Sequence, residues 1–163
     1  MRIRTSFWAP AILGLVADLL SKHYVFALLQ QAPGGRRPLL GPWLVLQLQR
    51  NTGGVFGFLP GKGYVFVALT IVALGFVVWM VRKSRPEQWL LRLALGLVTA
   101  GALGNLVDRL WFGFVRDFIY VEVINWPAFN IADSCICVAA TILFLEILRE
   151  GREEREGESS PSE

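Results

Sequence analysis

The hydrophobic residues of this chain are concentrated in four long runs. These runs cover roughly residues 7–29, 64–81, 89–110 and 129–148. Each is about 20 residues long, which is what a helix needs to cross the roughly 30 Å hydrocarbon core of a bilayer. The pattern predicts an all-α membrane protein with four transmembrane helices.

The two longer segments between these runs carry different signals. Residues 30–63 contain turn signals at 33–35 and 41–42, followed by a partly alternating stretch at 43–49 that is typical of a strand. We therefore expect a small extramembrane β-sheet, or cradle, on the bilayer surface. The segment 111–128 is rich in aromatic side chains, which prefer the headgroup level. We interpret it as a loop close to the membrane surface.

Length and composition agree with a single membrane domain. The chain has 163 residues, and 54% of them are hydrophobic, above the roughly 45–50% typical of soluble domains. We assign residues 1–149 to one integral membrane domain and predict that the charged tail, 150–163, is disordered. The first run resembles the hydrophobic part of a signal peptide, but it is long and contains Asp18 and Lys22, so we expect it to be retained.

The basic residues indicate how the helices are oriented. The net charge is +3, but Lys and Arg lie at the ends of the hydrophobic runs, which favours a topological role over nucleic-acid binding. The side that carries both termini has nine of them, and the other side has six. The positive-inside rule then places both termini in the cytoplasm and residues 30–63 and 111–128 outside.

The sequence lacks the residues that several kinds of catalytic site would need. His23 is the only histidine, and Cys135 and Cys137 lie within a hydrophobic run, so neither a metal site nor a cofactor is expected. Neither the G-x-S-x-G nor the H-E-x-x-H pattern occurs. Ser21 and Lys22 are adjacent and would point about 100° apart on a helix, which is poor geometry for a Ser–Lys pair.

Acidic residues in or near the hydrophobic runs are the best functional candidates, because a carboxylate in a bilayer is costly. Asp18 and Lys22 have i,i+4 spacing and can form an ion pair, while direct substrate contact remains an alternative. We expect Asp108 to find a partner locally, next to Arg109. Glu122 is interpreted as a solvated loop residue.

The predicted orientation brings Asp117 and Asp133 together at the outer membrane face. Two close carboxylates share a proton, so one can activate water while the other protonates a carbonyl oxygen, as in aspartic proteases. Composition and placement alone do not distinguish an enzyme from a carrier or a channel.

Four sequence blocks narrow these alternatives. The blocks are Asp18-Leu-Leu-Ser-Lys22, Asn51-Thr-Gly-Gly-Val-Phe-Gly57, Gly101 to Arg109 continuing to Val115-Arg-Asp-Phe118, and Phe129-Asn-Ile-Ala-Asp-Ser134. In order and spacing they resemble the boxes of the lipoprotein signal peptidase (signal peptidase II) family. The resemblance covers nearly the whole chain except the acidic tail.

The resemblance implies a bacterial inner-membrane aspartic endopeptidase without a cofactor. Its substrate would be a diacylglyceryl-modified prolipoprotein, cut just before the lipidated cysteine. The catalytic pair of the family matches Asp117 and Asp133. The substrate-binding or site-supporting positions match Asp18, Lys22, Asn51, Gly53, Gly104, Asn105, Arg109 and Asn130. Membrane lipid would surround the chain, and we expect a monomer. The alternative is a small carrier or channel with outward-facing acids.

Three positions depart from the family pattern. Leu19 follows Asp18 where the first box usually has Gln, and Gly54 stands where Ala is frequent. Arg116 precedes Asp117 where Val is frequent. A cation there would favour the ionised form of Asp117, unless Arg116 points toward lipid phosphates.

Overall fold

The computed structural model describes residues 2–41, 43–54 and 58–159, and it contains four long helices and one small sheet. The elements, in chain order, are α1 (Arg2–Gln30), η1 (Pro33–Gly35), β1 (Arg36–Leu40), β2 (Leu44–Asn51), α2 (Gly63–Lys83), α3 (Trp89–Phe112), β3 (Val115–Val121), η3 (Glu122–Ile124), β4 (Trp126–Phe129) and α4 (Ile131–Ser159). The predicted helices and small sheet are confirmed. Positions 42, 55–57 and 160–163, which belong to the predicted loop and tail, lie outside the described residues.

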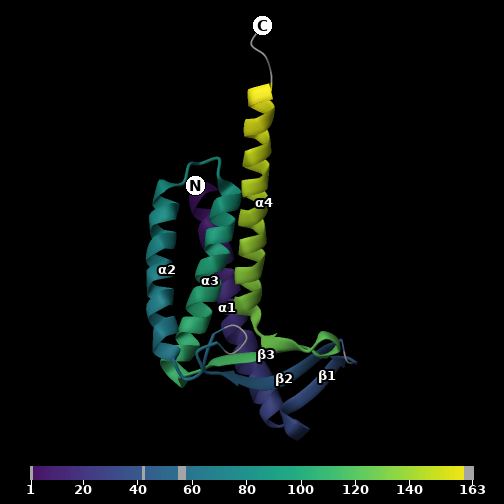
Figure 1. The fold of residues 1–163 in the computed structure, drawn as a ribbon. Coiled ribbons are helices and arrows are strands. Elements are labelled where there is room, and N and C mark those ends of the chain that lie inside the picture. The colour runs from purple at the N-terminus through teal and green to yellow at the C-terminus, as the bar shows by residue number, and fades with distance from the viewer. Residues whose placement is uncertain (1, 42, 55–57, 160–163) are drawn as a thin grey trace.

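Helix α3 is the centre of the bundle, with α1, α2 and α4 packed around it (Figure 1). Two of its glycines allow close helix contacts. A methyl group on Gly96 would lie 2.4 Å from the Phe7 carbonyl oxygen of α1. One on Gly101 would lie 2.4 Å from the Ala132 carbonyl oxygen of α4. Small residues at such crossings are how membrane helices gain close van der Waals packing.

The distribution of polar and apolar side chains in the bundle is that of a protein surrounded by lipid. Among the described residues, four helices are long and hydrophobic enough to cross a membrane. Large side chains such as Val72 and Phe76 of α2 are exposed, whereas Asp18, Lys22 and Asp108 are fully buried. Apolar groups therefore face outward and charged groups face inward, as expected where a bilayer surrounds the helices.

The sheet lies at the end of the bundle away from both termini (Figure 1). Its order is β1-β2-β3-β4, and all neighbours are antiparallel. Gly113 ends α3 in a left-handed conformation (φ 77°), and its N–H donates to the Arg109 carbonyl oxygen at 3.1 Å. This cap turns the chain from α3 directly into β3.

Two predicted boundaries need correction. The segment 111–128 was expected to be a loop, but it forms β3 and β4, since β-branched and aromatic residues pair well on a sheet. Helix α4 continues to Ser159 within the tail that was expected to be disordered. Glu and Arg are good helix formers, and extending an existing helix needs no new nucleation.

Candidate active site

The first turn of α4 holds Asp133 in a capping box. Asn130 precedes the helix, and its side-chain Oδ1 accepts a hydrogen bond from the Asp133 N–H at 2.9 Å. In return, Asp133 Oδ2 accepts a bond from the Asn130 N–H at 3.2 Å. Such reciprocal bonds satisfy N–H groups that a helix start leaves unpaired. The carboxylate of Asp133 is therefore oriented by the same contacts that begin the helix.

Strand β3 brings Asp117 to the same place. Both of its carboxylate oxygens accept hydrogen bonds from side-chain amides. Asn130 Nδ2 donates to Oδ1 at 2.7 Å, and Asn51 Nδ2 donates to Oδ2 at 3.0 Å. Asn130 thus contacts both aspartates, although they lie 16 positions apart in the sequence.

Asn105 joins this pair to the charged residues of α1. Its Nδ2 donates to Asp133 Oδ1 at 2.8 Å. Its Oδ1 accepts from Lys22 Nζ at 2.9 Å and from Asn130 Nδ2 at 3.2 Å. The amide is therefore fixed in one orientation, since its oxygen faces two donors and its nitrogen faces a carboxylate.

The predicted ion pair on α1 is present and fully buried. Lys22 Nζ lies 2.7 Å from Asp18 Oδ2. The other Asp18 oxygen accepts a bond from the Ala132 N–H at 2.8 Å, one residue before Asp133. Gly104 leaves room for this arrangement, because a methyl group there would lie 2.3 Å from Asp18 Oδ2.

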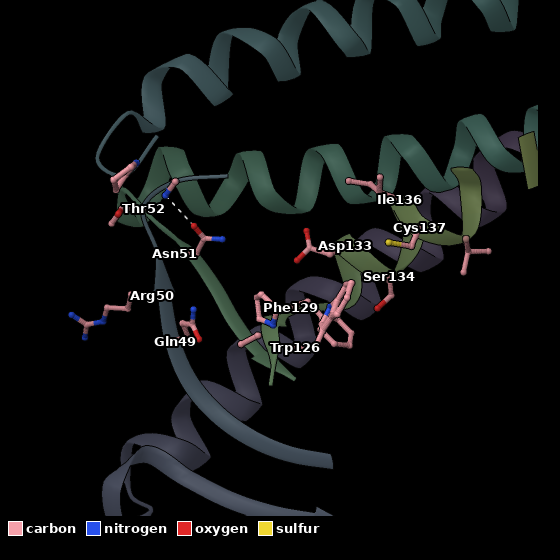
Figure 2. A pocket seen from close by; sticks show the side chains of 15 residues that line it. Gln49, Arg50, Asn51, Thr52, Trp126, Phe129, Asp133, Ser134, Ile136 and Cys137 are labelled. Atoms are coloured by element: carbon pink, nitrogen blue, oxygen red, sulfur yellow. Dashed lines mark hydrogen bonds between the residues drawn. The ribbon is translucent and has the colours of Figure 1, made fainter. Parts of the chain in front are cut away.

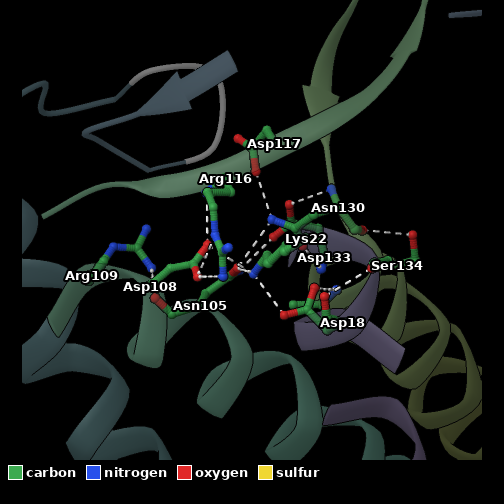
Figure 3. A network of polar contacts seen from close by, with 12 residues as sticks. Asp18, Lys22, Asn105, Asp108, Arg109, Arg116, Asp117, Asn130, Asp133 and Ser134 are labelled. Atoms are coloured by element: carbon green, nitrogen blue, oxygen red, sulfur yellow. Dashed lines mark hydrogen bonds and ion pairs between the residues drawn. The ribbon is translucent and has the colours of Figure 1, made fainter. Parts of the chain in front are cut away.

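Arg109 ties the loop after β2 to α3. Its guanidinium donates to the Gly53 carbonyl oxygen at 3.0 Å and to the Asn105 carbonyl oxygen at 3.5 Å. The Gly53 N–H donates to Asn51 Oδ1 at 2.9 Å, which orients the Asn51 amide toward Asp117. The ten site residues predicted from the sequence are thus brought together by these contacts, most of them shown in Figure 3.

The expected local pairing of Asp108 with Arg109 is wrong. Asp108 Oδ1 instead pairs with Arg116 Nη2 at 2.7 Å, and Asp108 Oδ2 lies 3.4 Å from Lys22 Nζ (Figure 3). Residues 108 and 116 lie on different elements, so helix spacing gives no signal for their contact. Arg116 therefore points neither at Asp117 nor toward lipid phosphates.

The surroundings of Asp117 favour its protonated form. Burial raises the pKa of Asp117 to about 7, and the nearby negative charge of Asp133 acts in the same direction. Hydrogen bonds from Asn51 and Asn130 and the charge of Lys22 oppose this shift only in part. A carboxyl group with such a pKa can hold a proton near neutral pH and donate it.

A cavity of about 600 Å³ opens beside Asp133 (Figure 2). One wall is polar and comes from β2 and the following loop, with Gln49 to Gly53. The opposite wall is mostly apolar and includes Phe129, Ile136 and Val138. Asp133 lines the cavity and is half-buried, whereas Asp117 is only 1% exposed. The site thus offers one accessible and one enclosed carboxyl group next to an amphipathic cavity.

Comparison with known proteins decides the family. The family model described as signal peptidase (SPase) II matches residues 10–149. The chain belongs to the signal peptidase II family. This peptidase is 39% identical over 153 residues to the lipoprotein signal peptidase of Syntrophomonas wolfei, covering 91% of this chain and 97% of that one. It is also 39% identical to the lipoprotein signal peptidase of Moorella thermoacetica, over 90% and 98% of the two chains.

Solved structures share the fold of this peptidase. A bacterial membrane enzyme solved by the in meso method at 2.3 Å has a TM-score of 0.83 and 28% identity, covering 98% of this chain and 93% of that one. A second, solved at 1.9 Å, has a TM-score of 0.77 and 31% identity, covering 88% and 92%. The arrangement of helices and sheet is therefore shared with solved bacterial membrane enzymes.

Proposed function

We propose that this peptidase removes the signal peptide from diacylglyceryl-modified prolipoproteins, just before the lipidated cysteine, with Asp117 and Asp133 as its catalytic pair. The observation that carries the proposal is the convergence of the two carboxyl groups on Asn130, one of them enclosed and one open to the cavity. Neighbouring carboxyl groups with different environments are suited to acid and base roles.

The two carboxyl groups lie in different environments and therefore take different catalytic roles. Asp133, on the cavity wall, is the ionised member and takes a proton from a water as the water oxygen attacks the scissile carbonyl carbon. Asp117, with its raised pKa, donates its proton to the carbonyl oxygen, giving a neutral diol. Asp133 then passes its proton to the amide nitrogen while the C–N bond breaks. Asp117 recovers a proton from the diol as the new carboxyl group forms.

The cavity walls match the two kinds of group in such a substrate. The apolar side formed by β4 and α4 suits acyl chains and the hydrophobic signal segment, because hydrocarbon next to a membrane-spanning helix stays in an apolar environment. The polar side formed by β2 and the next loop suits the peptide backbone, which needs hydrogen-bonding partners once it leaves water.

The placement of the site supports an outward-facing active centre. Asp117 lies on β3 and Asp133 in the first turn of α4. Both elements meet at the sheet end of the bundle, away from both termini (Figure 1). With more Lys and Arg on the side of the termini, the termini face the cytoplasm and the site faces the outer side of the inner membrane. The complete pair lies within one chain, so a monomer suffices for the reaction.

The test compares purified wild type with Asp117→Asn and Asp133→Asn on a diacylglyceryl-modified prolipoprotein, followed by the gel shift that marks loss of the signal peptide. Each substitution should reduce turnover by roughly 1,000-fold or more. Glu122→Gln is the matched control, because Glu122 is an exposed carboxylate that forms an ion pair, at 2.5 Å, with Arg36 on the sheet. Its turnover should stay near that of wild type.

Wild-type turnover in either Asp→Asn variant would remove that residue from the mechanism. Failure of the wild type on a competent substrate would overturn the proposed function itself. Far-ultraviolet circular dichroism and thermal unfolding of each variant separate lost chemistry from lost folding.

A further inference from the structure

Arg116 contacts Asp108 through both its backbone and its side chain. Its backbone N–H donates to Asp108 Oδ2 at 2.8 Å, and its Nε and Nη2 donate to Asp108 Oδ1 at 3.1 and 2.7 Å. Its guanidinium also lies 4.4 Å from the centroid of the Phe112 ring. Asp108 is fully buried and the Arg116 side chain is 12% exposed. Backbone and side chain of one strand residue are therefore both fixed to α3.

The attachment of Arg116 to α3 affects the neighbouring residue, Asp117. Successive residues of a strand point to opposite faces, so fixing Arg116 against α3 directs Asp117 the other way. That is the side where Asn51 and Asn130 hold the Asp117 carboxyl group. The position of Asp117 thus depends on an anchor one residue before it.

Asp108 also lies near Lys22, which contacts Asp18 and Asn105 as well. Lys22 Nζ lies 2.7 Å from Asp18 and 2.9 Å from Asn105, but 3.4 Å from Asp108. Asn105 in turn donates to Asp133. Because Arg116 balances the charge of Asp108, Lys22 stays close to Asp18 and Asn105. Without that balance, a buried unpaired carboxylate would attract Lys22 away from Asn105.

We propose that Arg116 is a positioning residue for both catalytic aspartates: its pairing with Asp108 aims Asp117 from β3 and leaves Lys22 to hold Asn105 against Asp133. The inference rests on the proposed function. Arg116 and Asp108 do not line the cavity, so the effect falls on the chemical step and not on substrate binding.

The experiment measures kcat and KM for wild type, Arg116→Met, Arg116→Lys and the double variant Asp108→Asn/Arg116→Met, each corrected for its folded fraction. Arg116→Met should lower kcat about tenfold, within the roughly 100-fold that a 1 Å misplacement costs, with KM within about twofold. Arg116→Lys keeps the charge but loses the two-point contact, so it should fall between wild type and Arg116→Met. The double variant removes both charges, so no unpaired carboxylate competes for Lys22, but it also lacks the side-chain anchor of β3. Its kcat should therefore rise only part of the way from that of Arg116→Met toward wild type.

Arg36→Met is the matched control, since Arg36 forms an ion pair with Glu122 on the exposed part of the sheet, with both side chains about 40% exposed. It should leave kcat and KM unchanged. Unchanged kcat in Arg116→Met, a rise in KM instead of a fall in kcat, or a double variant no faster than Arg116→Met would each overturn the proposal. If Arg116→Met does not fold, Arg116→Lys decides, and wild-type kcat in it overturns the proposal. An active wild type in the same assay distinguishes these results from failure of the proposed function.

Discussion

Gly104 offers the most direct test of how closely the helices must approach around the site. It is buried on α3, and a methyl carbon there would lie 2.3 Å from Asp18 Oδ2, 3.0 Å from Asp18 Cγ and 3.3 Å from the Ala132 Cβ. Ordinary contact requires roughly 3.5 Å, so Gly104→Ala must push the Asp18 carboxylate away by about 1 Å. That shift disturbs its contacts with Lys22 at 2.7 Å and with the Ala132 N–H at 2.8 Å.

The size of the effect follows from opposing contributions. Overpacking costs about 1–3 kcal/mol, and breaking a buried ion pair costs about 3–5 kcal/mol when the break is complete. Alanine is favoured over glycine within a helix by about 1 kcal/mol. Because the ion pair is displaced and not deleted, we expect Gly104→Ala to lower the free energy of unfolding by about 2–4 kcal/mol. Turnover should fall by about 10- to 100-fold through the loss of alignment.

The assay is unfolding of the purified protein in mixed detergent–SDS micelles, with peptidase activity measured on the same samples. Gly75→Ala is the matched control, because Gly75 lies on α2 with nothing within 4 Å of the added methyl group. It should be stabilised by up to about 1 kcal/mol. If Gly104→Ala unfolds at the same SDS fraction as Gly75→Ala, the close packing of Asp18 against α3 is not what the structure indicates.

Two further predictions concern the carboxyl pair and the cavity. Because burial raises the pKa of Asp117 to about 7 from 3.8, the folded state binds a proton that the unfolded state releases, so stability should fall as the pH rises from about 4 to about 7. Thermal unfolding between pH 4 and 8 should show a flatter dependence for Asp117→Asn, and parallel curves would contradict the raised pKa. Cys137 is exposed and lines the cavity, so a membrane-permeable maleimide should label it, and a bound lipopeptide should slow that labelling. The labelling is measured by mass spectrometry in a Cys135→Ala background, and equal rates with and without lipopeptide would place the ligand elsewhere.

The helices were predictable because each depends on a simple requirement. About 20 consecutive hydrophobic residues are costly anywhere except in a bilayer, so the four runs stand out without any tertiary information. Their ends were less certain. Phe129 was assigned to the last helix, but it ends β4, and α4 begins only after Asn130. Phenylalanine is compatible with either element, and only the capping contacts of Asn130 decide the boundary.

The sheet was only half predictable. The alternation at 43–49 marks β2. The strand β3 has a similar signal in Val115–Val121, but its aromatic residues also suit a membrane surface, so the sequence alone does not distinguish a strand from a surface loop there. A strand at this position would have indicated that Arg116 and Asp117 point in opposite directions.

Within the site, the short-range pairing was predicted and the long-range pairing was not. The contact between Asp18 and Lys22 follows from i,i+4 spacing. The bond from Lys22 to Asn105 spans 83 positions, and spacing alone contains no information about it. The predicted orientation placed Asp117 and Asp133 at the same membrane face, but their assignment as a catalytic pair depended on resemblance to a family, because composition and placement also allow a carrier or a channel.

The long-range bonds also affect when the enzyme first becomes active during its synthesis. Asp18, in the first membrane span, accepts its bond from Ala132, 114 positions later and in the last span. Asn105 of the third span likewise donates to Asp133 in the fourth. A nascent chain with three spans inserted therefore lacks a complete pair of acids. The two acids can therefore come together only after the last of the four spans has been inserted.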